Sequence, residues 1–202
     1  FLSHKLSTVV RAAATHALYC DSIYLDPDER RRFAQVSHEY LIAQFQEQTW
    51  TTSSTELNFN HPVKELVLTQ DDNLVDSSAA ITPSPISGTN ILLKLNGHER
   101  FAPRGTTYFS RQQIYDYHTG PGCLTENDTL CVYSFALKPE EHQPSGTCNF
   151  SRIDSAILQC NTVPTLLNAA DGSTEILDSI HVYAVNYNVL RIMSVIGGLA
   201  YS

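Results

Sequence analysis

Histidines are the side chains best suited to bind a metal or move a proton near neutral pH, so their spacing tests for such chemistry. They stand at His4, His16, His38, His61, His98, His118, His142 and His181. The closest two, His4 and His16, are 12 positions apart, and neither an HExxH nor a His-x-His pattern occurs. A metal centre would therefore have to be assembled by the fold alone. We interpret each histidine as structural or solvated.

Other catalytic and phosphate-binding patterns are also missing from the sequence. It has no GxGxxG, GxxxxGK[ST] or GxSxG motif. Its five cysteines, an odd number without CxxC spacing, favour reduced, buried thiols in a reducing compartment over a disulfide framework. They are Cys20, Cys123, Cys131, Cys148 and Cys160. A cysteine nucleophile would need a neighbouring base, and no pattern identifies one.

A few polar clusters remain as candidate sites. The run Glu29-Arg-Arg-Arg32 fits either an anion site or a solvated turn, and we favour the turn. Arg152 and Asp154 are two apart on an expected strand, so they share a face and fit an ion pair or a contact to the preceding loop. Asn127 and Asn149 match the N-glycosylation pattern, but reduced thiols argue against its use.

Composition narrows the class of protein further. The 202 residues carry a net charge of −8, which disfavours a sequence-independent grip on nucleic acid. Only 17% are charged, and Ser, Thr and Asn fill the gap, as suits strands and turns. No apolar run is long enough to span a membrane, and no signal peptide is visible. Because the chain starts at Phe1, we expect a fragment or a processed product.

Short apolar or alternating segments, separated by turn signals, fill the chain. Strands are predicted at 17–25, 38–50, 57–60, 63–69, 91–95, 107–115, 131–137, 151–160 and 178–193. Long loops are predicted at 71–90 and 138–149, and a turn at Gly172. With eight or so strands and no composition shift, the sequence predicts one all-β sandwich of two sheets.

Local turn chemistry refines this prediction. Asn96-Gly97 between strands is a strong hairpin signal. Pro62 after His61 predicts a corner, a bulge or an edge. Helix is expected only as short turns in loops, one of them at 29–33 with Asp26 as its cap.

Five sequence blocks resemble a known family. They are YSFALKPEEHQPSGTCNFSRID at 133–154, VYAVNYNVLRIMSVIGGLAYS at 182–202, LDPDERRRFAQ at 25–35, FNHPVKEL at 59–66 and LNGHERF at 95–101. The blocks resemble the major capsid proteins of nucleocytoplasmic large DNA viruses, occur in that family's order and cover most of the chain. The chain departs from the family at Leu68, where an aromatic is usual, and at Val195, where glycine is usual.

The resemblance implies a fold and a role. It implies an eight-stranded antiparallel jelly-roll β-sandwich, the second roll of a double jelly roll, with residues 1–16 as a linker or leading segment and 17–202 as the roll. It implies a capsid protein of the virion, assembled in the host cytoplasm as trimeric, pseudo-hexameric capsomers of an icosahedral shell. Its partners would be its own copies, neighbouring capsomers, and minor capsid and penton proteins. It implies no enzyme activity, no cofactor or metal, no direct nucleic-acid contact, and proximity to an inner membrane without spanning it.

Candidate assembly residues follow from the 133–154 block and the 61–62 corner. We expect two prolines, Pro139 and Pro144, and Gly146 to fix the path of the loop. The pair Arg152 and Asp154 would anchor its exit. Replacing Arg152 by alanine should then impair folding or trimer yield. The remaining structural candidates are His61 and Pro62.

Other residues and function classes stay open. The aromatics Tyr115, Tyr117, Tyr201 and Phe101 fit subunit contacts and ordinary packing equally well. A carbohydrate-binding jelly roll is the alternative function, although a lone Trp50 at a strand end gives it little support. A jelly-roll enzyme of the cupin type is disfavoured, because those enzymes bind metal through a His-x-His pair.

Overall fold

The structure is a computed structural model, and it describes most of the chain. The described residues are 23–50, 52–70, 90–120, 130–161, 165–167, 174–176, 180–193 and 196–201. Several sequence predictions lie outside them: the 17–22 part of the first strand, the loop at 71–89, the Gly172 turn, Asn127 and Val195.

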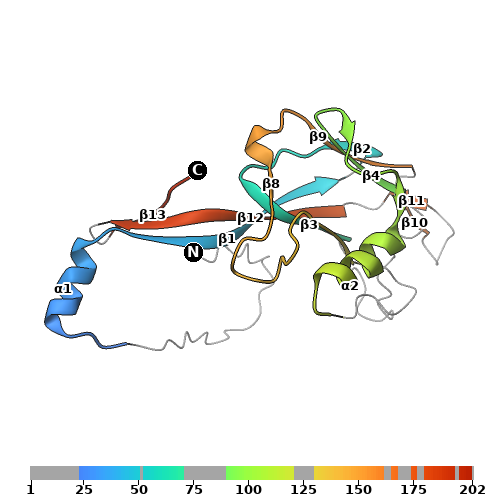
Figure 1. Cartoon of the computed structure of the whole chain (residues 1–202). Helices are drawn as coiled ribbons and strands as arrows, with labels where there is room; N and C mark the ends of the chain where they lie inside the picture. The colour runs from blue at the N-terminus through green and yellow to red at the C-terminus, as the bar shows by residue number, and fades with distance from the viewer. Residues whose placement is uncertain are drawn as a thin grey trace, which may run out of the picture.

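Two antiparallel sheets form the body of the molecule (Figure 1). Among the described residues, the first sheet has the strand order β1-β12-β3-β7, with β13 added to β12 and β8 added to β3. These strands are β1 (His38–Trp50), β12 (Ile180–Met193), β3 (Pro62–Gln70), β7 (Leu130–Ser134), β13 (Ile196–Leu199) and β8 (Cys148–Asn149). Neighbours in this sheet are far apart in the sequence, so the chain must cross repeatedly between the sheets.

The second sheet supplies the facing layer. Within the described part of the chain its order is β2-β9-β4-β5, with β6 paired to β4. The strands are β2 (Ser54–Glu56), β9 (Ala156–Cys160), β4 (Asn90–Leu95), β5 (His98–Glu99) and β6 (Arg104–Gly105). Each sheet therefore has a path of four main strands, and the chain crosses repeatedly between the two sheets. This arrangement is a jelly roll, which confirms the predicted fold class. A separate hairpin pairs β10 (Thr165–Leu167) with β11 (Thr174–Ile176).

The core lies between the two sheets and follows the period of two residues expected for strands. In β12, Ile180, Val182 and Ala184 are buried and alternate with half-buried residues. Leu68, at the position where an aromatic was expected, is 2% exposed and pairs with Val182. Because Leu68 is buried, the sandwich tolerates leucine in place of the usual aromatic residue at this position.

Two glutamine side chains on β1 hydrogen-bond the backbone of the irregular segment that follows β2. Gln48 on β1 donates to the Glu56 carbonyl and accepts the Asn58 N–H. Gln46, two residues earlier on the same face, binds both the N–H and the C=O of Asn60. The irregular backbone after β2 is therefore hydrogen-bonded by side chains, since no ladder partner serves it there.

The predicted strand at 107–115 is wrong. This segment is a π-helix, η1 (Tyr108–Gln112), continued by the short helix α2 (Gln113–Tyr117). Its buried residues Phe109, Ser110, Gln113 and Ile114 form two i,i+4 pairs on one helical face. Because two of those buried residues are polar, hydropathy concealed the helical period, and the aromatic and β-branched content favoured a strand.

Smaller differences occur at the ends of other elements. Helix α1 (Pro27–Gln35) is longer than the predicted turn, and Asp26 stands at its N-cap without a side-chain hydrogen bond. Residues 23–25 and 57–60 are not strands. The predicted strand at 151–160 begins only at Ala156, after the single 3₁₀ turn η2 (Phe150–Arg152).

Two of the predicted turns are confirmed. Asn96 and Gly97 both have positive φ, 51° and 79°, and they join β4 to β5. His61 has a φ of 68° directly before β3, so the His61-Pro62 step is a corner.

A long arm extends from the sandwich (Figure 1). β1 pairs with β12 along all 13 of its residues, whereas β3 pairs only with the Ile180–Asn186 part of β12. The remainder of β12, with β13 beside it, projects away from the body, and α1 lies at the far end. We call the segments 23–43 and 187–201 the distal arm.

Candidate functional site

The loop at 137–147, within the signature block, is held in place by hydrogen bonds and by close packing at Gly146. Gly146 has a φ of 145°, and a Cβ there would lie 2.9 Å from the Phe135 carbonyl oxygen. Ser145 Oγ accepts the Lys138 N–H at 2.8 Å, which closes the base of the loop. Lys64 Nζ donates to the carbonyl of buried Pro139 at 2.8 Å. Gly146 thus has the conformation and contacts expected of a residue that fixes the path of the loop, while Pro144 is exposed.

The exit of the loop is tied to the His61 corner. Asn149 caps η2 by accepting the Ser151 N–H at 3.1 Å. Ser151 Oγ in turn accepts the His61 N–H, and the His61 carbonyl accepts the Phe150 N–H. Pro62 pairs with Asn149 across β3 and β8. The structure therefore brings together His61, Pro62 and Asn149, three residues that the sequence singled out separately.

Arg152 and Asp154 do not form the predicted anchor. They lie on η2 and just beyond it, not on a strand, and both are exposed. No ion pair joins them in the part of the chain that the structure describes. Instead, Asn96 Oδ1 accepts the N–H groups of Asp154 and Ser155, at 2.9 and 3.1 Å. Asn96, a turn residue 58 positions from Asp154, therefore holds the backbone at the exit of the loop, a role that we had expected of Arg152.

A histidine between two carboxylates connects the loop to the sheet. His118, at the end of α2, has Nε2 3.1 Å from Glu65 Oε2 on β3 and Nδ1 3.2 Å from Glu140 Oε1 on the loop. Thr119 donates its N–H and its hydroxyl to Glu140. These two Thr119 bonds, together with His118, hold the pKa of Glu140 below its ordinary value.

The distal arm carries most of the exposed large apolar side chains of the described residues. Its exposed large apolar side chains are Ile23, Tyr24, Leu25, Phe33, Val36, Tyr40, Met193, Ile196, Leu199 and Tyr201. Tyr24 is 90% exposed and Ile196 is 76% exposed, so both side chains are largely uncovered by the described residues. A concentration of this kind indicates a contact surface rather than scattered surface residues.

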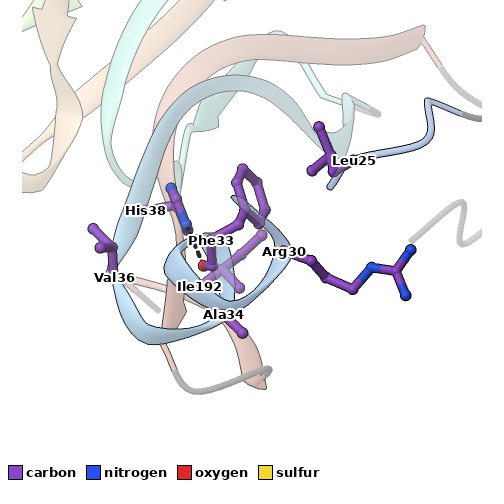
Figure 2. Close-up of a pocket in the computed structure, with 7 residues that line it drawn as sticks. All are labelled: Leu25, Arg30, Phe33, Ala34, Val36, His38 and Ile192. Carbon is purple, nitrogen blue, oxygen red and sulfur yellow. Dashed lines mark hydrogen bonds between the residues drawn. The ribbon is translucent and has the colours of Figure 1, made fainter. Parts of the chain in front are cut away.

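A shallow pocket of about 270 Å³ lies within the distal arm, where α1 meets β1 and β12 (Figure 2). It is lined by Leu25, Arg30, Phe33, Ala34, Val36, His38 and Ile192. His38 Nε2 lies 2.8 Å from the Phe33 carbonyl oxygen, and the two rings stack at 4.1 Å. The lining is mostly apolar, and its only ionisable groups are the Arg30 guanidinium and the His38 imidazole. Because His38 is engaged with Phe33, this lining suits packing.

The described residues give little support to metal binding, membrane spanning or sugar binding. No group of three or more His, Cys, Asp or Glu there is arranged to hold a metal ion. No described helix is long and apolar enough to cross a membrane. Of the described cysteines, Cys131 and Cys160 are buried, and burial raises the pKa of the half-buried Cys148. Trp50 is 2% exposed, so it offers no surface platform for a sugar.

The four aromatics left open by the sequence separate into different groups. Phe101 packs on the core, with its ring 5.5 Å from Phe109 and 4.9 Å from Tyr133. Tyr115 and Tyr201 are exposed, which leaves both free for subunit contacts. Tyr117 is half-buried at the end of α2.

Sequence reasoning missed Gln46, Gln48 and His118. The two glutamines lie on the inward face of β1, where alternating glutamines at 44, 46 and 48 were a readable signal. Nothing local to His118 distinguished it, because its partners lie 53 and 22 positions away in the sequence, at Glu65 and Glu140.

Comparison with known proteins gives a consistent result. The family described as large eukaryotic DNA virus major capsid protein matches residues 29–198. The major capsid protein of Pyramimonas orientalis virus is 47% identical over 92% of this chain and 48% of its own length. That of Paramecium bursaria Chlorella virus 1 is 38% identical over 100% of this chain and 57% of its own length. The chain thus spans about half the length of these relatives.

Solved structures show the same likeness. PBCV-1 VP54, fitted into a cryo-EM reconstruction of the virophage Sputnik, superimposes with a TM-score of 0.66 at 34% identity. That match covers 89% of this chain and 55% of VP54. The Faustovirus major capsid protein, at 12% identity and a TM-score of 0.54, shares the fold.

Proposed function

Because this chain belongs to the family of large eukaryotic DNA virus major capsid proteins, we propose that it is one roll of a capsid shell protein, the second of two in tandem. The observation that carries the proposal is an apolar arm on an otherwise closed sandwich. A shell subunit needs a stiff body and surfaces that match its own copies, whereas an enzyme needs a pocket with reactive groups.

The jelly roll supplies the stiff body. Its two sheets bury a shared core, and its loops are free to vary at the ends without disturbing that core. The 137–147 loop is fastened at Gly146 and Pro139, so the signature block belongs to the rigid part. This attachment supports the proposal that the block, with His61 and Pro62, positions a surface for assembly.

The distal arm supplies the matching surface. Burying one large apolar side chain contributes about 1.5–3 kcal/mol, so a few such residues are enough to favour a stable contact. Tyr24 and Ile196 are among the most exposed, and β13 presents Ile196 at the edge of the arm. We assign this surface to contacts with the rest of the full-length protein and with its copies in a trimeric, pseudo-hexameric capsomer.

The domain division and the wider partners remain part of the same proposal. The relatives are about twice as long as this chain, which supports a second roll elsewhere in the protein. We place residues 1–16 in a linker or leading segment and 17–202 in the roll. Neighbouring capsomers, and minor capsid and penton proteins, are the proposed partners, with assembly in the host cytoplasm.

The alternative of a carbohydrate-binding module gains no specific support. A sugar site on a β-sandwich would use an exposed aromatic platform, and Trp50 is buried. The curated relatives are named as capsid proteins, which supports a structural role over an enzymatic one.

The test is the mass in solution of the complete protein that contains this chain, measured by light scattering after size exclusion. We expect a trimer, and we expect Ile196→Glu to shift it toward monomer by placing a charge on the contact surface. Gln112→Glu, an exposed position off the arm, is the matched control and should stay trimeric. A monomeric wild-type protein at micromolar concentration would contradict the proposal.

A further inference from the structure

Strand β12 changes its neighbour where the sandwich gives way to the distal arm. Its Ile180–Asn186 part pairs with β3, and its Leu190–Met193 part pairs with β13. Residues 187–189 pair with β1 on one side, and in the described part of the chain no strand ladder continues on their other side. The backbone groups that point to this other side therefore need partners of another kind.

The side chain of Asn188 takes the place of a ladder partner in this gap. Its Oδ1 accepts the N–H of Val189 at 2.7 Å, and its Nδ2 donates to the C=O of Tyr201 at 2.9 Å. Nδ2 also donates to Gln44 Oε1 on β1 at 2.9 Å, so both amide hydrogens are used. Asn188 is 2% exposed, and these bonds offset the cost of burying its amide.

The buried face of β12 changes from apolar side chains to amides at this junction. Three buried apolar residues in the core are followed, on the face that alternate residues share, by the buried asparagines Asn186 and Asn188. Burial alone would favour another apolar side chain at position 188, because such a side chain needs no hydrogen-bond partner. The amide therefore contributes through its specific bonds rather than through packing.

The segment that follows the gap forms only a weak strand by itself. β13 has four residues, two of them glycine, and all four are exposed. Glycine has no side chain to pack and loses the most conformational freedom when it is ordered. After β13, two hydrogen bonds fasten the chain to β12: the Ala200 N–H donates to the Val189 carbonyl at 2.8 Å, and the Tyr201 carbonyl accepts from Asn188.

We infer that Asn188 is a positioning residue, which clamps residues 196–201 to β12 and thereby fixes the exposed apolar side chains of this part of the arm. These are Ile196, Leu199 and Tyr201, which are 76%, 49% and 62% exposed. The inference rests on the proposed function, since these side chains belong to the surface assigned to contacts between copies. A surface that is ordered beforehand binds more tightly, because less conformational freedom is lost on association.

Asn188→Asp removes the clamp with almost no change in shape. At pH 8 the carboxylate still accepts the Val189 N–H, but it has no hydrogen to donate to the Tyr201 carbonyl, which can only accept. The Gln44 amide can turn its N–H groups toward the new carboxylate, so the loss falls on the segment at 196–201. Asn58→Asp makes the same substitution at an exposed position of the body and is the matched control.

Hydrogen exchange of the complete protein at pH 8 measures the clamp, and light scattering on dilution measures its effect on assembly. We expect protection of the Ala200 amide to fall about five- to tenfold in Asn188→Asp, as for one lost hydrogen bond, with the amide of buried Val182 unchanged. The variant trimer should dissociate at a concentration about fivefold or more above that of the wild type. Asn58→Asp should match the wild type in all three measurements.

Three results would overturn the inference: wild-type protection of Ala200 in Asn188→Asp, an equal loss of protection at Val182, or a trimer of wild-type stability despite lost protection at Ala200. The second result would mark Asn188 as a general stabiliser of the core. Should Asn188→Asp fail to fold, Asn188→Leu fills the same buried space without a donor, and the same expectations apply. A monomeric wild type would contradict the capsid role, whereas protection of Ala200 would still decide whether the clamp exists.

Discussion

Replacing Gly146 by alanine tests whether the signature loop depends on close backbone packing. The position has a φ of 145°, and the new Cβ would lie 2.9 Å from the Phe135 carbonyl oxygen and 3.3 Å from Ala136 Cα. Backbone strain of this kind costs about 1–3 kcal/mol, and forcing packed atoms apart costs about 1–3 kcal/mol more. We expect Gly146→Ala to lower the free energy of unfolding by about 4 kcal/mol.

Two other glycines separate the contributions. Gly97 has a φ of 79° with nothing within 4 Å of its Cβ position, so Gly97→Ala carries strain without a clash, about 1–2 kcal/mol. Gly105 meets only atoms at 3.7 Å or beyond and has no positive φ, so Gly105→Ala should be close to neutral. Urea unfolding with a slope of about 2 kcal/mol/M would place the Gly146→Ala midpoint roughly 2 M below the wild type. The reasoning is refuted if Gly146→Ala is no less stable than Gly97→Ala.

Two further substitutions address the corrected anchor and the amide contacts. Arg152→Ala should change stability by no more than about 0.5 kcal/mol, because the side chain is exposed; a loss above about 2 kcal/mol in thermal or urea unfolding would restore the anchor hypothesis. Gln48→Ala should cost about 2 kcal/mol, since it leaves the Glu56 carbonyl and the Asn58 N–H without their partner. Exposed Gln112→Ala is its control, and equal unfolding midpoints for the two variants would show that the amide contacts contribute nothing.

The sequence predicted best those elements whose burial repeats over many residues. The strand expected at 38–50 is His38–Trp50, and that expected at 178–193 is Ile180–Met193. Both carry a long period-two pattern that no helix can satisfy. The hairpin at Asn96-Gly97 was equally readable, because both residues need positive φ and this pair tolerates it.

Prediction failed where polar residues are buried or where partners are distant. Ser110 and Gln113 are buried on the face of a helix, so counting apolar residues at 107–115 favoured the wrong period. Arg152 and Asp154 were close in sequence and of opposite charge, yet the Asp154 backbone is held by the distant Asn96. In the candidate site, the residues around Gly146 in the sequence were enough to identify it. The contacts of His118 depend on tertiary packing, so the sequence did not reveal them.

The continuity of β12 has a mechanical consequence. The same strand runs from the buried Ile180 to the exposed Met193, so a load applied at the arm reaches the core without crossing a flexible joint. Tension along the strand axis acts in shear on β1 and β12, across all 13 residues of β1 at once. Backbone bonds perpendicular to the pull must then break together rather than one after another. Two strands paired in this way would therefore resist a pull along the arm better than a contact whose bonds open one at a time.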